Sequence, residues 1–154
     1  MNNVYQEPFM DKDGDRFYGA TILAATAIFF AAKDMFSFLS TEQLAGRDLA
    51  SNYAMTWLMG ENLSNGQIFS WTNQWLLGFP SFEAYPPFFF LFTAGIDILS
   101  GSLIGLQTVF KTTVFLSVFL VPLTVFLALK TRFGKLEAFF SGVYMLLFLF
   151  VYPP

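Results

Sequence analysis

The stretch "LQTVFKTTVFLSVFLVPLTVFLAL", Leu106–Leu129, decides the class of fold. A membrane helix needs about 20 mostly apolar residues, and this run reaches that length with Lys111 as its one charged residue. Pro122 predicts a kink, which neighbouring helices in a bundle tolerate. The run therefore predicts a transmembrane helix, which we place at residues 105–130.

Other apolar runs flank this one. They predict membrane spans at 17–39, 86–104 and 136–152, with a polar, acidic tail at 1–16 and a long loop at 40–85. The fold class that follows is all-α: a polytopic membrane bundle of about four transmembrane helices. The chain stops within the apolar run "FLFVYPP". We therefore expect the N-terminal fragment of a longer protein, and the alternative is a complete four-span protein.

The composition supports a membrane protein and excludes several functions. The chain is 55% hydrophobic and 12% charged, about half the charge of soluble domains. Its net charge of −3 and its lack of a basic stretch argue against binding nucleic acid. Because it has no cysteine and no histidine, disulfides, zinc sites of the Cys/His type and imidazole bases are excluded. The N-terminus lacks the basic region of a signal peptide.

The long loop 40–85 contains all three tryptophans, at Trp57, Trp71 and Trp75. Tryptophan favours the headgroup level of a membrane, so we expect this loop to lie along the membrane surface. The part after the "ENLSNG" turn is aromatic and ends in prolines, which is typical of an extended stretch.

A short amphipathic helix is expected within this loop, from Asp48 to Gly60. Asp48 suits the N-cap and Gly60 suits the stop. Leu49, Tyr53 and Trp57 repeat every four residues, which predicts one apolar face turned toward the membrane.

Asp48 is the strongest candidate for chemistry, because it lies just beyond the first span at the start of this helix. A carboxylate there suits a general base, or a ligand of a hard divalent cation such as Mg²⁺ or Mn²⁺. Arg47 and Lys33 are candidates for binding the phosphate of a lipid-linked substrate. The alternative reading makes Asp48 only an N-cap and Arg47 only a headgroup contact.

Glu61 and Glu83 complete the candidate metal ligands, together with Asp48. Carboxylates that fold against one another bind hard cations, but the spacing of these three is not diagnostic. Solvated loop acids are the simpler interpretation of Glu61 and Glu83.

Asp97 and Lys111 lie within predicted spans, where charges are costly and usually paired or functional. Each is about seven residues from the expected turn between the second and third spans, roughly 10 Å deep at the helical rise. Equal depth predicts an ion pair between them. A role in a transport pathway is the second interpretation.

Orientation is the point on which the sequence conflicts with itself. Lysine and arginine mark cytoplasmic loops, and "KTRFGK" at 130–135 is the most basic loop. If all four segments cross, this loop falls on the same side as the acidic loop 40–85. A re-entrant second segment would remove the conflict, so both arrangements stay open.

Several motifs together resemble a known family. The order is a first span, "GRD", an amphipathic helix, "WTNQWLLGFPSFEAYPPFFF", two further spans, "LALKTRFGK", and a span ending in "VYMLLFLFVYP". This order is similar to the N-terminal part of polytopic membrane glycosyltransferases of the GT-C class. The likeness is greatest to prokaryotic membrane proteins labelled 6-pyruvoyl-tetrahydropterin-synthase-related. The chain departs from that pattern in having Arg47 where histidine is frequent.

The resemblance implies a multi-pass protein of a prokaryotic cell membrane. It implies a polyprenyl-phosphate-linked sugar as donor and transfer to an acceptor hydroxyl on the non-cytoplasmic face, which would be the side of loop 40–85. It also implies that Asp48 is the acid that such enzymes use as base or metal partner. The alternative function is a non-catalytic membrane scaffold or accessory subunit, which binds a lipid, a partner or other membrane subunits through its aromatic first loop.

Overall fold

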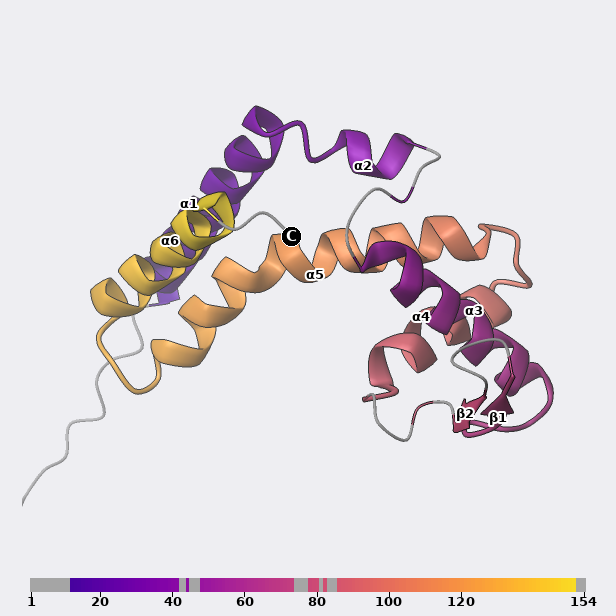
Figure 1. Cartoon of the computed structure of the whole chain (residues 1–154). Helices are drawn as coiled ribbons and strands as arrows, with labels where there is room; N and C mark the ends of the chain where they lie inside the picture. The colour runs from indigo at the N-terminus through magenta and orange to yellow at the C-terminus, as the bar shows by residue number, and fades with distance from the viewer. Residues whose placement is uncertain are drawn as a thin grey trace, which may run out of the picture. The chain divides into compact units, whose positions relative to one another are not determined.

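The computed structural model describes residues 12–41, 44, 48–73, 78–80, 82 and 86–151 (Figure 1). These residues are mostly helical, which confirms the all-α class. In chain order the elements are α1 (Lys12–Ala32), α2 (Ser37–Ser40), α3 (Leu49–Ser64), β1 (Trp71–Thr72), β2 (Phe79–Pro80), α4 (Phe88–Leu99), α5 (Leu106–Leu129) and α6 (Lys135–Val151). They form two compact units: one joins the chain up to Met35 with the chain from Ser117 onward, and the other is Phe36–Leu116.

The first unit consists of α1, α6 and the C-terminal part of α5. Helix α1 lies alongside α6 (Figure 1), and Ile22, Phe126 and Ala138 form a fully buried core where the three helices meet. Gly142 permits the close approach of α6. A Cβ atom there would lie 2.9 Å from the Pro122 carbonyl oxygen and 3.0 Å from Ile22 Cδ1. Because packing is tight at this crossing, the small residue fixes the position of α6.

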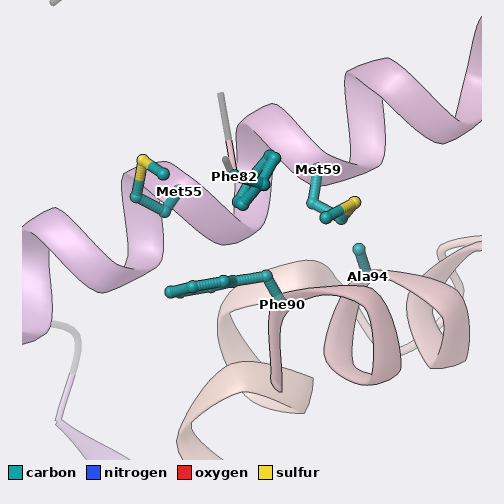
Figure 2. Packing of buried hydrophobic residues seen from close by; sticks show 5 residues of the cluster. All are labelled: Met55, Met59, Phe82, Phe90 and Ala94. Atoms are coloured by element: carbon teal, nitrogen blue, oxygen red, sulfur yellow. The ribbon is translucent and has the colours of Figure 1, made fainter. Parts of the chain in front are cut away.

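The second unit is built on the packing of α3 against α4. Met55 and Met59 of α3 lie over Phe90 and Ala94 of α4, and Phe82 fills the space between the two helices (Figure 2). Residues from three separate stretches of the chain therefore form one apolar core. In the loop between these helices, β1 and β2 pair in antiparallel register, with Trp71 opposite Pro80 and Thr72 opposite Phe79.

Gly78 precedes β2 and adopts a φ of +103°, which L residues with a side chain rarely adopt. A Cβ there would lie 2.7 Å from Nε1 of the Trp71 indole. Glycine at this position therefore permits both this backbone conformation and the close approach of the indole ring. The described strands have the extended backbone that the sequence predicted here, and they pair with each other.

One predicted span is confirmed as a helix long and apolar enough to cross a membrane, namely α5, and it is the one such helix in the part of the chain described. Helix α4 has 12 residues, about 18 Å at the helical rise, and is much shorter than the predicted span at 86–104. Helix α1 ends at Ala32, earlier than the predicted boundary at residue 39. Among the described residues, α5 alone therefore combines the length of a span with a strongly apolar composition, although α1 also has 21 residues.

The ends of α1, α3 and α4 share one physical cause. In each, a residue with positive φ follows the helix, and two amides bond back to carbonyls of the last turn, which is the Schellman motif. In α3 the Gly66 amide donates to Leu63 and the Gln67 amide donates to Asn62, each at 2.9 Å. The residues with positive φ are Asp34, Gly66 and Gly101.

The predicted stop of α3 at Gly60 is wrong, because the helix continues to Ser64. Gly60 lies inside the helix and faces α4: a Cβ there would make only an ordinary contact with the Cβ of Ala94, at 4.0 Å. Gly66, two residues after the last helical residue Ser64, is the glycine that ends the helix. Two glycines near a helix end are both plausible stops from sequence, and tertiary packing decides between them.

Replacing Gly142 with alanine should destabilise the first unit. The added methyl group meets a backbone carbonyl that cannot rotate away, and overpacking of this kind costs about 1–3 kcal/mol. Thermal unfolding in detergent, followed by circular dichroism, measures the effect. Gly95→Ala in α4 is the matched control, because its Cβ meets nothing within 4 Å and alanine should stabilise a helix interior by about 0.5–1 kcal/mol. Equal stability of the two variants would contradict the packing.

Candidate functional site around Asp48

Asp48 occupies the N-cap position of α3, as the sequence predicted, but its carboxylate does not cap the helix. The main chain of Asp48 begins the helix: its carbonyl oxygen accepts bonds from the Asn52 amide and the Ser51 hydroxyl, each at 2.9 Å. The side chain is exposed and makes no capping hydrogen bond. The Asp48 carboxylate therefore does not cap α3, which was the structural alternative to a catalytic role.

The helix behind Asp48 is fixed by a different face from the one predicted. The residues of α3 that are buried are Met55, Thr56, Met59 and Asn62, whose intervals of one, three and three residues place them on one side of the helix. Trp57, expected on the apolar face, is 42% exposed. The ring of Tyr53 contacts Phe110 at 5.6 Å between centroids. Asp48 is thus presented by a helix whose long face is anchored to α4 and α5.

Neither candidate phosphate ligand can be measured against Asp48, because one belongs to the other unit and one lies outside the described residues. Lys33 is exposed and lies in the turn that ends α1, in the first unit, whereas Asp48 belongs to the second. Arg47 lies outside the described residues. Their assignment to phosphate therefore stays a prediction.

The predicted metal set of Asp48, Glu61 and Glu83 is corrected by the length of α3. Asp48 and Glu61 lie at opposite ends of one continuous helix, about 20 Å apart at 1.5 Å per residue, so they cannot bind the same cation. Glu83 lies outside the described residues. Within the described ranges, no group of three acidic, cysteine or histidine residues converges as metal ligands do.

Asp97 and Lys111 are both buried, but they do not form the predicted ion pair with each other. Oδ2 of Asp97 accepts a bond of 3.0 Å from the Ser102 hydroxyl, and Oδ1 has no hydrogen-bond partner within the described part of the chain. Lys111 Nζ donates to the carbonyl of Thr41 and lies 5.6 Å from the centre of the Phe38 ring. The equal depth expected for Asp97 and Lys111 therefore did not imply contact, because Asp97 bonds to Ser102 and Lys111 bonds to Thr41.

Asn62 is a structural residue that the sequence analysis did not single out. It is 6% exposed. Its Oδ1 accepts a bond of 2.6 Å from the Ser70 hydroxyl, and its Nδ2 donates to the Ile68 carbonyl at 3.4 Å. Asn62 follows Met55 and Met59 at intervals of seven and three, and this helical spacing is the signal that could have identified it as buried.

Three comparisons with known proteins bear on identity. A scan of protein-family descriptions, a search of curated proteins and a search of solved structures each find no match for this chain. The resemblance to GT-C glycosyltransferases therefore rests on the order of its sequence motifs.

Replacing Asp48 with alanine should leave stability almost unchanged, within about 0.5 kcal/mol, as for a surface substitution. A capping aspartate would cost about 0.5–2 kcal/mol instead. The measurement is thermal or denaturant unfolding of the protein in detergent. Gly66→Ala is the positive control at the other end of α3, because φ is +72° there and alanine in that conformation costs about 1–2 kcal/mol. A loss for Asp48→Ala as large as for Gly66→Ala would restore the capping role.

Proposed function

We propose that this chain belongs to a membrane glycosyltransferase-like protein of the GT-C type. In this proposal it transfers a sugar from a polyprenyl-phosphate-linked donor to an acceptor hydroxyl at the non-cytoplasmic face of a prokaryotic cell membrane. The membrane location is supported by α5, whose most apolar 18-residue stretch is only 11% buried. A core helix of a soluble protein would be mostly buried. Large apolar side chains are also exposed along α6, among them Phe140, Tyr144 and Leu147.

The observation that carries the catalytic part is the state of the Asp48 carboxylate. The carboxylate is exposed and makes no capping bond. It belongs to the residue that begins α3, a helix held in place by its buried face. A general base needs a carboxylate that can reach a substrate proton and is held by a rigid element. Asp48 meets both conditions.

The proposed reaction is a single displacement with inversion. Asp48 takes the proton of the acceptor hydroxyl, and the acceptor oxygen attacks C1 of the sugar. The bond between C1 and the phosphate oxygen breaks, and the electron pair leaves with the lipid phosphate. Arg47, the neighbour of Asp48 in the chain, is the cation proposed to stabilise that departing phosphate. A divalent cation bound by the phosphate and Asp48 would supply additional positive charge.

Replacing Asp48 with asparagine should lower the rate of sugar transfer about 10²–10⁴-fold, which is the usual contribution of a general base. The protein as its gene encodes it is reconstituted in vesicles with a radiolabelled polyprenyl-phosphate sugar and a hydroxyl acceptor. Glu61→Gln is the matched control, because Glu61 is an exposed acid at the far end of the same helix, and it should retain full turnover. Undiminished transfer by Asp48→Asn would remove the assignment.

The second candidate function is a non-catalytic scaffold that binds a lipid or protein partner through its first loop. It is favoured by a cluster of exposed apolar side chains just before and within β1: Ile68 at 41%, Phe69 at 57% and Trp71 at 65%. Exposed clusters of this kind mark contact surfaces, and tryptophan suits the membrane interface. Complete absence of transfer in the wild-type protein would favour this function.

A further inference from the structure

One carboxylate joins three helix ends in the first unit. Asp15 lies near the start of α1, and its Oδ2 is 2.8 Å from Lys130 Nζ, while its Oδ1 is 3.2 Å from Lys135 Nζ. Lys130 directly follows α5, and Lys135 is the first residue of α6. The side chains are partly sheltered, at 22%, 24% and 33% exposure for Asp15, Lys130 and Lys135. We call this group the Asp15 clamp.

The Asp15 carboxylate is charged at physiological pH. The hydrogen bond from Lys130, and then the contact with Lys135, hold the pKa of Asp15 below its ordinary value of 3.8. A lowered pKa means that the carboxylate's contribution to stability is fully present above pH 4 or so and is lost as the pH falls through the lowered value. Asp15 therefore keeps its negative charge throughout the neutral range.

Packing along α1 agrees with the clamp. Tyr18, near Asp15, contacts Phe126, which is four residues before Lys130, at 6.4 Å between ring centroids. Phe30, toward the far end of α1, contacts Phe119 at 5.2 Å. Helix α1 therefore runs antiparallel to this part of α5, and the beginning of α1 lies at the same level as the end of α5.

Helix α4 is too short for an independent crossing. Its 12 residues give about 18 Å, against a hydrocarbon core of about 30 Å. It ends in a Schellman motif at Gly101, and it packs along α3. It has the properties of one arm of a helical hairpin.

We infer that the chain crosses the membrane three times, through α1, α5 and α6, and that α3 and α4 stay on one face. If α1 and α5 each cross once, the clamp requires the start of α1 and the end of α5 to share a face. The segment between them must then leave and re-enter the membrane on the same face, so α4 does not cross. A crossing by α4 would separate Asp15 from Lys130 by about the 30 Å of the hydrocarbon core.

The charges assign the faces. Arg16, Lys130, Arg132 and Lys135 lie at the clamp end, and Lys/Arg-rich ends face the cytoplasm. In the segment 40–105, Arg47 is the one basic residue. The acids of that segment are Glu42, Asp48, Glu61, Glu83 and Asp97. Three crossings therefore put the acidic segment, with Asp48, on the non-cytoplasmic face, and the conflict seen in the sequence disappears. The inference rests on the membrane location within the proposed function and not on sugar transfer.

Cysteine labelling tests the topology in a chain that has no native cysteine. Single variants Ser64→Cys, Leu103→Cys and Thr131→Cys are at exposed positions. A membrane-impermeant maleimide is applied to intact cells and to inverted vesicles, with detergent-opened samples as the control for reactivity. We expect residues 64 and 103 to be labelled from outside and residue 131 only from the cytoplasmic side. Labelling of 103 on the face opposite to 64 would overturn the inference.

A cross-link provides a second measurement that leaves the clamp intact. In the double variant Arg16→Cys with Thr131→Cys, both cysteines neighbour clamp residues, so a short bifunctional maleimide should join them within one chain. The pair Ser64→Cys with Thr131→Cys is the control and should not be joined. Absence of the first cross-link in protein that reacts with single maleimides would contradict the shared face. Loss of sugar transfer in Asp48→Asn has no bearing on either measurement, so the two proposals fail separately.

Discussion

The two lysine contacts of Asp15 set the register of the three helices around it, because little else there is directional. If the three helices lie in lipid, as proposed, there is no hydrophobic driving force between them of the kind that operates in water. Apolar side chains such as Ile22 and Phe126 fill space but do not select one sliding position. A sheltered carboxylate between Lys130 and Lys135 has one position at which both contacts form. The absence of a Cβ at Gly142 then lets α6 close on α1 and α5 at that register.

The α3–α4 hairpin is held by other means, which explains how a short helix can remain stable. Met55 and Met59 are flexible side chains that adapt to the flat rings of Phe82 and Phe90. Asn62 then ties the end of α3 to the following loop through Ser70. Apolar packing in the middle and a polar contact at the end therefore hold α3 against α4 and its loop.

The sequence predicted those features that depend on local pattern and failed on those that depend on partners. The span at Leu106–Leu129 and the start of α3 at Asp48 follow from hydropathy and capping rules, and both are confirmed as helix boundaries. The stop at Gly60 and the apolar face through Trp57 were wrong, because the presence of α4 decides which glycine packs and which side is buried. The length of α4 was also wrong, since hydropathy continues through Leu103 and Ile104 although the helix ends at Leu99.

The two buried charges show why the second apolar segment turns back instead of continuing. Ser102 bonds to Asp97 twice, through its amide to the carbonyl oxygen and through its hydroxyl to Oδ2, so Asp97 fastens the turn that ends α4. Lys111 donates instead to the carbonyl of Thr41, the residue that follows α2. A transport pathway uses intramembrane charges as relays, whereas each of these two has a partner of its own elsewhere in the fold. The burial of Asp97 is thus explained by its part in the turn that ends α4.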